Sequence, residues 1–289
     1  MKEPIFTGVC TALVTPFLDG KVNYPMLKLL LKRQMDAGIP ACVICGTTGE
    51  ASTLSDQEKL EMFRVSKEFV GDSMQIIAGT GSNCTDHAVW LSNEAEKLGV
   101  DGLLVVSPYY NKANEEGLVA HYMTIAHSVK IPVILYNVPG RTGLDMPVSV
   151  YKRLARIPNI AGVKEASTSI TKITKILYEC GADLPIWSGN DDMAVAAIAL
   201  GAKGVVSVTS NVAPEDVRFM TNAALNGDFE TAGALQCAMS PLNEALFCDV
   251  NPIPVKAAMK QIGYDCGSCR LPLTDLTKEK FEMLKALFA

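Results

Sequence analysis

Lys164 is the residue of this sequence whose type and position are best suited to covalent chemistry. It follows the apolar residues 160–163, which predict a strand enclosed by the protein core. Burial disfavours an ammonium ion, so it lowers the pKa of a lysine and leaves a neutral, nucleophilic amine. Such an amine can attack a ketone and form a Schiff base. Two structural alternatives remain: Lys164 pairs with Glu165 or another acid, or it ends its strand and reaches water.

Two glycines enclose a pair of hydroxyl residues after an earlier apolar run, in the segment Gly46-Thr47-Thr48-Gly49-Glu50. Glycines let backbone N–H groups approach a ligand, and successive N–H groups form a nest that binds anions. The sequence has neither a Walker lysine motif nor GxGxxG, so a small carboxylate fits this turn better than a nucleotide phosphate. A glycine turn of this kind is, however, often only a turn.

Tyr136 and Arg141 flank a Pro-Gly turn after another apolar run. A tyrosine at a strand end packs more often than it transfers protons, but imine chemistry requires several proton transfers. The three histidines all fall in predicted helices, so Tyr136 becomes the candidate acid and base beside Lys164. Arg141 can bind a carboxylate through two parallel hydrogen bonds, although an arginine on a loop is commonly only solvated.

Eight short apolar segments alternate with helical patterns over most of the chain. They cover residues 9–14, 41–45, 75–79, 102–106, 133–137, 160–165, 185–188 and 204–208, and they begin 19 to 34 residues apart. This spacing accommodates one strand and one return helix. Continuous apolar runs are typical of strands covered on both faces. The pattern predicts an α/β fold, a single (β/α)8 TIM barrel, with a doubly wound open sheet as the alternative.

Helical patterns at residues 24–37, 55–70, 84–98 and 115–128 separate the first strands, and Ser55 with Glu58 forms a capping-box start for the second. After residue 226 the chain has helical patterns interrupted at 251–254 and 267–272. We therefore expect a catalytic barrel over residues 1–226 and a helical appendage over 227–289. Barrel enzymes carry their active sites at the carboxyl ends of the strands, where the candidate groups lie.

Composition excludes several classes of protein. The 289 residues are 48% hydrophobic and 20% charged with a net charge of −5, which is typical of a globular protein without a basic patch for nucleic acid or anionic membranes. The chain has no apolar run of the ~20 residues that span a bilayer, and its start lacks a signal-peptide pattern. We expect a soluble cytoplasmic protein with reduced thiols. The loop pair Cys266 and Cys269 lacks further metal ligands nearby, so no metal site is predicted.

Five segments together resemble a known family. GTTGE (46–50), SPYYN (107–111), YNVPGRTG (136–143), GVKEAS (162–167) and NPIPVK (251–256) are similar to motifs of the 4-hydroxy-tetrahydrodipicolinate (dihydrodipicolinate) synthase family, pyruvate-dependent class I aldolases. The resemblance runs in order through nearly the whole chain. It implies a lyase of the diaminopimelate route to lysine, with pyruvate and L-aspartate 4-semialdehyde as substrates. It also implies no cofactor and a homotetramer (a dimer of dimers), or at least a dimer.

The resemblance assigns catalytic roles to four residues. Lys164 would form the imine with pyruvate, and Tyr136 would donate and accept protons. Thr47 would link Tyr136 to Tyr110, which a neighbouring subunit would supply. The enamine of pyruvate would add to the aldehyde, and the substrate amine would then release the lysine by transimination.

Four further residues would bind substrates by the same resemblance. Thr48 and the backbone at Val206 would hold pyruvate, and Gly189 would line the same pocket. Arg141 would bind the carboxylate of L-aspartate 4-semialdehyde. These roles agree with the chemistry of the groups, since the glycine turn suits one carboxylate and the guanidinium another.

Many relatives are inhibited by lysine, and part of that effector site differs here. The candidate effector residues are Asn83, Tyr109, Ala51, Asp56, Lys59 and His87, of which the last three replace two histidines and a glutamate of lysine-sensitive bacterial relatives. The glutamate is lost and a lysine is gained, which disfavours a cationic ligand electrostatically. We therefore expect weak or absent inhibition by lysine.

Two other functions compete with this interpretation. An N-acetylneuraminate lyase or a 2-keto-3-deoxy sugar-acid aldolase would share the fold and the imine chemistry. Neuraminate lyases typically have GSTGE at the glycine turn and usually lack NPIPVK, so both segments favour the synthase. A barrel that only senses a keto acid would need no proton relay, which the joint presence of Lys164, Tyr136, Thr47, Tyr110 and Arg141 argues against.

Overall fold

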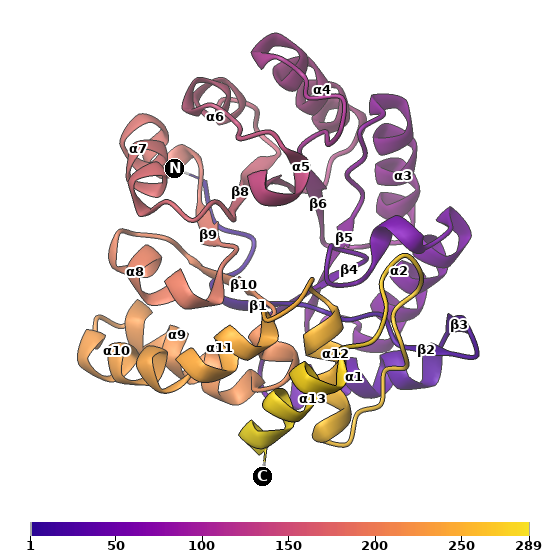
Figure 1. Ribbon diagram of the computed structural model, residues 1–289. Helices are drawn as coiled ribbons and strands as arrows, with labels where there is room; N and C mark the ends of the chain where they lie inside the picture. Colours follow the sequence, from indigo (N-terminus) through magenta and orange to yellow (C-terminus); the bar gives the residue numbers. More distant parts are fainter. Residues whose placement is uncertain (1, 289) are drawn as a thin grey trace.

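Eight parallel strands close into a barrel at the centre of the molecule, drawn in the computed structural model of Figure 1, which describes residues 2–288. The strands are β1 (Gly8–Ala12), β4 (Ala41–Ile44), β5 (Gln75–Gly79), β6 (Gly102–Val106), β7 (Val133–Asn137), β8 (Ile160–Glu165), β9 (Ile186–Ser188) and β10 (Gly204–Ser207). Around the barrel each strand pairs with the next along the chain, and β10 pairs with β1. The closed barrel confirms the predicted (β/α)8 fold and excludes the open sheet.

Helices cover the outside of this barrel on all sides (Figure 1). They are α1 (Tyr24–Asp36), α2 (Asp56–Val70), α3 (Thr85–Lys97), α4 (Glu115–Ser128), α6 (Val148–Leu154), α7 (Ile170–Cys180), α8 (Ala194–Ala199) and α9 (Pro214–Leu225). The predicted capping box starts α2, because Ser55 Oγ accepts from the Glu58 N–H and Glu58 accepts from the Ser55 N–H. Local sequence therefore places the start of this helix.

Side chains along the strands alternate between the barrel interior and the surrounding helices. Besides aromatic side chains such as Trp187, the interior layer consists of small and branched residues, namely Cys10, Ala12, Ala41, Val43, Ile77, Leu104, Ile134 and Val206. Tyr136 belongs to the same interior cluster, and its register partner on β8 is Lys164. The outward-facing residues, such as Leu135 and Val163, pack under the helices.

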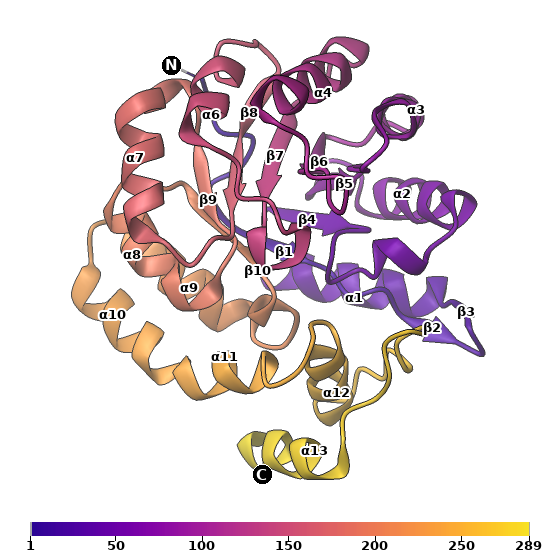
Figure 2. The same cartoon turned by 45° about the horizontal axis from the view of Figure 1, so that its top comes forward.

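The chain after α9 forms four more helices near the mouth of the barrel. They are α10 (Phe229–Ala238), α11 (Ser240–Leu246), α12 (Ile253–Gln261) and α13 (Lys278–Lys285). Figure 2 shows α11 and α12 beyond the end of the barrel toward which β7 points. Residues 262–277 contain no helix or strand and return to the barrel beside a hairpin of β2 (Phe17–Leu18) and β3 (Lys21–Val22). The Phe17 N–H donates to the Cys266 carbonyl across this contact.

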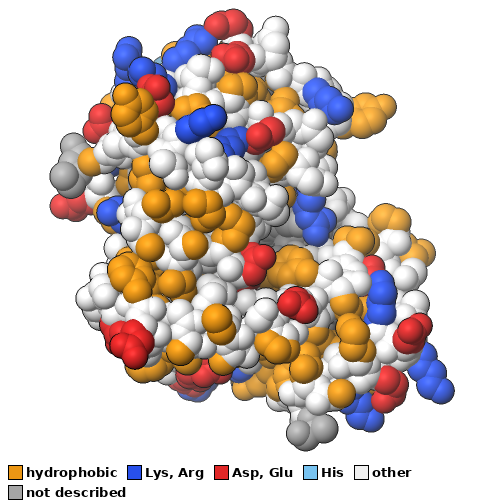
Figure 3. All heavy atoms as spheres, turned by 60° about the vertical axis from the view of Figure 1, so that its left-hand side comes forward, with side chains coloured by type: hydrophobic (Ala, Val, Ile, Leu, Met, Phe, Trp, Pro, Cys, Tyr) orange, Lys and Arg blue, Asp and Glu red, His pale blue; other side chains and the backbone are white. Residues whose placement is uncertain are grey.

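The outer surface mixes polar and apolar side chains. Figure 3 shows one face on which small groups of apolar side chains lie among acidic and basic ones. The exposed large apolar residues include Tyr178 on α7 and Phe219 on α9. Among residues 2–288, every helix falls short of the length and hydropathy that a membrane span requires.

Candidate active site

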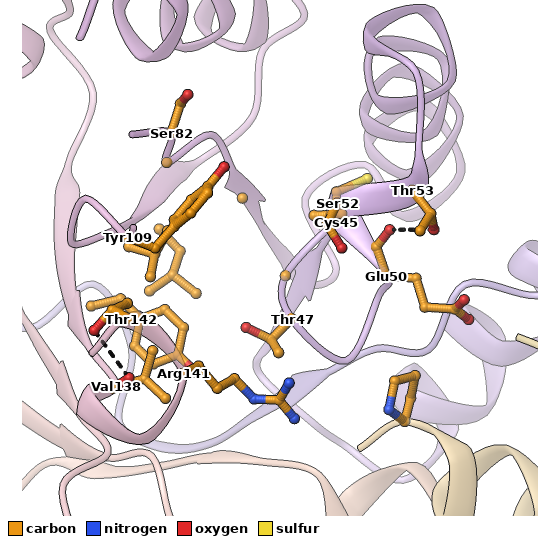
Figure 4. Close-up of a pocket in the computed structure, with 18 of the residues that line it drawn as sticks. Cys45, Thr47, Glu50, Ser52, Thr53, Ser82, Tyr109, Val138, Arg141 and Thr142 are labelled. Atoms are coloured by element: carbon orange, nitrogen blue, oxygen red, sulfur yellow. Dashed lines mark hydrogen bonds between the residues drawn. The ribbon is translucent and has the colours of Figure 1, made fainter. Parts of the chain in front are cut away.

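A cavity of about 620 Å³ opens at the carboxyl ends of the barrel strands. Residues that follow β4, β5, β6 and β7 form one part of its wall, and residues 250–252 and 272–273 form another. Figure 4 shows Arg141 extending into the cavity toward Thr47, with Tyr109 on another side. The carboxyl ends of the strands are the face on which (β/α)8 enzymes carry their chemistry.

Lys164 lies on β8 at the base of this mouth, and its side chain is buried, with only 5% of the residue exposed. Its Nζ is 4.3 Å from the centre of the Tyr136 ring on the neighbouring strand. Within residues 2–288 of this chain, Lys164 forms no salt bridge. The Glu165 carboxylate instead accepts hydrogen bonds from Tyr151 and Asn137. The alternative that Lys164 pairs with Glu165 is therefore wrong.

The absence of a side chain at Gly189 leaves room for the Lys164 side chain. A Cβ atom at this position would lie 3.1 Å from Lys164 Cε and 2.5 Å from the Ala166 Cβ. On the same side, Val206 is buried in the interior layer on β10. Glycine at 189 thus lets the lysine stem pass close to the backbone after β9.

Asp191 is a buried carboxylate close enough to interact electrostatically with Lys164. Burial raises the pKa of its carboxyl group, while hydrogen bonds and the Lys164 charge act in the opposite direction. Ser207 donates to one carboxylate oxygen, and the N–H groups of Val208 and Thr209 donate to the other, the latter two at 2.8 and 3.2 Å. Asp191 therefore ties the segment after β9 to the segment after β10, next to Val206.

The glycine turn after β4 is held by the C-terminal part of the chain. Thr48 is buried, and its Oγ1 accepts from the Asn251 side-chain amide at 2.9 Å. Glu50 has a left-handed φ of 54° and forms a buried ion pair with Lys256, whose Nζ is 2.9 Å from Glu50 Oε1. Thr47 remains free to line the cavity. The motifs GTTGE and NPIPVK, quoted separately from the sequence, thus meet at the barrel mouth.

Arg141 ends the one-turn helix α5 (Pro139–Thr142), which follows β7. One guanidinium nitrogen, Nη2, donates to the Asn251 carbonyl at 3.0 Å. A guanidinium carries five N–H donors, so Arg141 retains donors for an anion in the cavity that it lines. The Asn251 contact fixes the direction of the side chain.

Tyr109 and Tyr110 follow β6 and occupy different environments. Tyr109 lines the cavity and is partly exposed, whereas Tyr110 has a φ of 72° and is 91% exposed. Within residues 2–288 of this single chain, no hydrogen bond joins Tyr110, Thr47 and Tyr136. The chain alone therefore brings Thr47 and Tyr136 to one cavity and leaves Tyr110 outside it.

The candidate effector residues lie at the outer part of the cavity. Ala51, Lys59, His87 and Tyr109 line it, and Asn83 accepts a hydrogen bond from Asn111 through its carbonyl. The Asp56 carboxylate lies between an imidazole and an ammonium group: its oxygens are 3.0 Å from His87 Nε2 and 3.4 Å from Lys59 Nζ. Burial opposes ionisation of Asp56, but His87 and Lys59 outweigh it and lower the pKa of Asp56.

Cys266 and Cys269 are free thiols in the segment that returns to the barrel. Burial is the main reason that the pKa of each thiol rises to about 12. A thiol with such a pKa is almost entirely protonated at neutral pH and is a poor nucleophile. This environment is typical of packing residues.

A buried lysine amine that faces a phenol at the mouth of a (β/α)8 barrel is the arrangement of a class I aldolase-type enzyme, in which lysine forms an imine with a keto substrate. A family model described as the dihydrodipicolinate synthetase family matches residues 5–289. The 4-hydroxy-tetrahydrodipicolinate synthase of Acetivibrio thermocellus is 48% identical over 285 residues, which cover 99% of this chain and 97% of the relative. The chain belongs to the dihydrodipicolinate synthetase family.

Solved structures agree with this family over nearly the whole chain. Dihydrodipicolinate synthase from Aquifex aeolicus has a TM-score of 0.96 and 39% identity, covering 98% of this chain and 97% of that one. The Cyanidioschyzon merolae enzyme, solved with lysine bound, has a TM-score of 0.95, 39% identity and the same coverage. A structure described as the first monomeric dihydrodipicolinate synthase variant has a TM-score of 0.96 and 36% identity, covering 98% and 96%.

The family defines the reaction of this chain. It is a lyase of lysine biosynthesis that condenses pyruvate with L-aspartate 4-semialdehyde to 4-hydroxy-tetrahydrodipicolinate. The sequence-based prediction of the enzyme and of its substrates is confirmed.

Proposed function

We propose that Lys164 is the residue that captures pyruvate, and that the reaction uses no cofactor. The Lys164 nitrogen attacks the keto carbon of pyruvate, and the carbonyl oxygen leaves as water to give a protonated imine. Loss of a methyl proton then produces an enamine. The observation that carries this proposal is the buried amine 4.3 Å from the Tyr136 ring, with no acid paired to it in the described chain.

The enamine carbon then forms a carbon–carbon bond with the aldehyde carbon of L-aspartate 4-semialdehyde. The aldehyde oxygen takes a proton and becomes the 4-hydroxyl group, and the imine on Lys164 is restored. The substrate amine attacks that imine carbon, the bond to Lys164 breaks, and the ring closes as the free lysine is regenerated. Tyr136, whose ring centre is 4.3 Å from Lys164 Nζ, would donate and accept the protons, and Thr47 and Tyr136 line the same cavity.

Two separate anion sites would orient the substrates. Thr48 and the backbone at Val206 would hold pyruvate beside Lys164, next to Gly189, whose backbone lies close to the Lys164 side chain. Arg141 reaches the cavity from the other wall with donors to spare, and would bind the carboxylate of L-aspartate 4-semialdehyde through charge-assisted hydrogen bonds. This division gives the carboxylate of each substrate its own binding groups until carbon–carbon bond formation.

The direct test of this function is the consumption of pyruvate on addition of L-aspartate 4-semialdehyde. Turnover that requires both substrates supports the proposal. Turnover with sugar aldehydes but not with the semialdehyde would overturn it. Added chelator should leave the rate unchanged, because the lysine imine provides the electron sink that another enzyme would take from a metal.

We also propose that the active form is at least a dimer and is a homotetramer in the family's usual manner. Tyr110 supports this assembly, because its exposed ring and left-handed backbone project it away from its own chain. A neighbouring subunit could then place Tyr110 near Thr47 and Tyr136. Analytical ultracentrifugation of the active enzyme tests this assembly, and a fully active monomer would contradict it.

Weak or absent inhibition by lysine is a further prediction from the outer cavity. Lys59 and His87 flank the only acid among the three changed positions, Asp56, which is already paired with both. A lysine ligand would therefore meet positive charge without a free carboxylate. Initial rates at millimolar lysine should stay within about twofold of the uninhibited rate, since a charge of the wrong sign lowers affinity.

A matched variant makes the lysine prediction sharper. The combined substitutions Asp56→His, Lys59→His and His87→Glu restore the lysine-sensitive pattern and should make inhibition stronger. Wild-type enzyme that is strongly inhibited at millimolar lysine would contradict the prediction.

A further inference from the structure

Glu165 is a buried carboxylate on the face of β8 opposite Lys164, between the barrel and the helices. It is fully buried and accepts hydrogen bonds from three groups. Asn137 Nδ2 is 2.9 Å from Oε1, the Ser167 N–H nitrogen is 2.8 Å from Oε1, and the Tyr151 hydroxyl is 2.9 Å from Oε2. Neither the active-site roles proposed above nor the cavity involves this residue.

All three partners of Glu165 donate hydrogen bonds to its oxygens. A backbone N–H and an amide NH2 can only donate hydrogen bonds. Burial and the charge of Glu165 raise the pKa of Tyr151 well above its usual value, so its hydroxyl stays protonated and donates too. A glutamine at this position would turn its own NH2 toward one of these donors. Glu165 therefore accepts three hydrogen bonds at once and serves as a shared acceptor, the Glu165 hub, that no neutral side chain can replace.

This hub joins the ends of the two strands that carry Lys164 and Tyr136. Asn137 and Glu165 are register partners, one residue beyond the partners Tyr136 and Lys164. The Asn137–Glu165 bond therefore lies directly behind the pair whose separation is 4.3 Å. Any shift between the carboxyl ends of β7 and β8 would change that separation.

The same network reaches the segment that follows Arg141. The Asn137 amide also donates to Asp145 at 2.9 Å and accepts from the Met146 N–H at 3.1 Å. Asp145 in turn pairs with Lys172 on α7. Residues 145 and 146, which follow the segment that bears Arg141, are thus held to the ends of β7 and β8 through Asn137.

We infer that Glu165 is a positioning residue for the reaction, acting through Asn137 and Tyr151 to hold the Lys164 amine and the Tyr136 ring in reacting geometry. This inference rests on the proposed roles of Lys164 and Tyr136. It assigns a rate effect to the hydroxyl of Tyr151, a buried group on α6 that lies outside the cavity.

The test compares Tyr151→Phe with Tyr122→Phe. Each substitution removes one hydroxyl from a fully buried tyrosine on a neighbouring helix, and only the first hydroxyl contacts Glu165. The Tyr122 hydroxyl donates to the Val105 carbonyl at 3.3 Å. Active sites are counted by reducing the pyruvate imine with borohydride, so that kcat refers to folded enzyme. Thermal unfolding of both variants measures their stability separately.

We expect Tyr151→Phe to lower kcat per trapped site about tenfold, because a misplacement well below 1 Å costs part of the ~100-fold loss that 1 Å can cause. The KM for pyruvate should change by less than about twofold, since the groups that bind its carboxylate are untouched. Tyr122→Phe should keep kcat within about twofold of wild type. Glu165→Gln, which removes the acceptor itself, should lose about 100-fold.

The outcomes separate this inference from the proposed function. Equal kcat per trapped site in Tyr151→Phe and Tyr122→Phe would overturn the positioning role, even if both variants unfold at lower temperature. A Glu165→Gln enzyme that folds and retains wild-type kcat would overturn it as well. Wild-type enzyme that traps no pyruvate at all would overturn the proposed function, and this inference with it.

Discussion

Replacing Lys164 with alanine should lower kcat by at least about 10³-fold, as expected when a covalent nucleophile is removed. No other described amine occupies the position 4.3 Å from the Tyr136 ring, so the variant cannot form the pyruvate imine there. The enzyme should still fold, because Lys164 makes no salt bridge that its loss would leave unpaired in residues 2–288. Initial rates with both substrates measure the effect.

The matched control for this variant is Lys203→Ala. Lys203 precedes β10, at the amino end of the barrel, and so lies far from the mouth. Its replacement should leave kcat within about twofold of wild type, because the residue contacts none of the reacting groups. A Lys164→Ala enzyme that still becomes radiolabelled by pyruvate and borohydride at the active site would show that another amine is the nucleophile.

Replacing Lys256 with methionine should lower the free energy of unfolding by about 3–5 kcal/mol, as expected when one partner of a buried ion pair is removed. The side chains of Lys256 and Glu50 are only 4% and 1% exposed. Lys256 Nζ also donates to the Ser268 carbonyl at 3.2 Å and lies 4.4 Å from the centre of the Phe17 ring. Urea unfolding followed by circular dichroism measures the loss.

An exposed pair provides the control for the buried one. Lys32 and Asp36 on α1 form a salt bridge of 2.7 Å, but their side chains are 57% and 63% exposed. Lys32→Met should therefore lower the unfolding free energy by less than about 1 kcal/mol. If Lys256→Met is no more destabilising than Lys32→Met, the buried pair does not hold the glycine turn to the C-terminal segment.

The barrel could be predicted because its elements are determined locally. β5, β6, β7 and β8 have the predicted bounds. β4, β9 and β10 differ from prediction by one residue at one end, and β1 begins one residue earlier and ends two residues earlier than predicted. Continuous apolar runs between helical patterns indicate where each strand begins and ends, and each strand with its helix occupies only about 30 residues. The Asp19-Gly20 turn of the β2–β3 hairpin also had a sequence signal, since Asp-Gly favours a two-residue hairpin turn, but the strands are too short to show alternation.

Some features of the candidate site could likewise be predicted from the local sequence, and others could not because they depend on distant contacts. Lys164 stood out because a lysine interrupts an apolar run, and strand alternation places residues 164 and 165 on opposite faces, a signal that argues against their pairing. The contact between Glu50 and Lys256 joins residues 206 positions apart, and no local pattern reveals it. The Glu165 hub likewise depends on Tyr151 and Asn137, which meet only when α6 packs on β7 and β8.

The most direct test of the central claim is to locate the pyruvate imine in the wild-type enzyme. The protein is incubated with pyruvate, reduced with borohydride and digested, and the modified residue is identified by mass spectrometry. We predict a single stable adduct on Lys164. An adduct on a different lysine, or no adduct under conditions of full activity, would contradict the account.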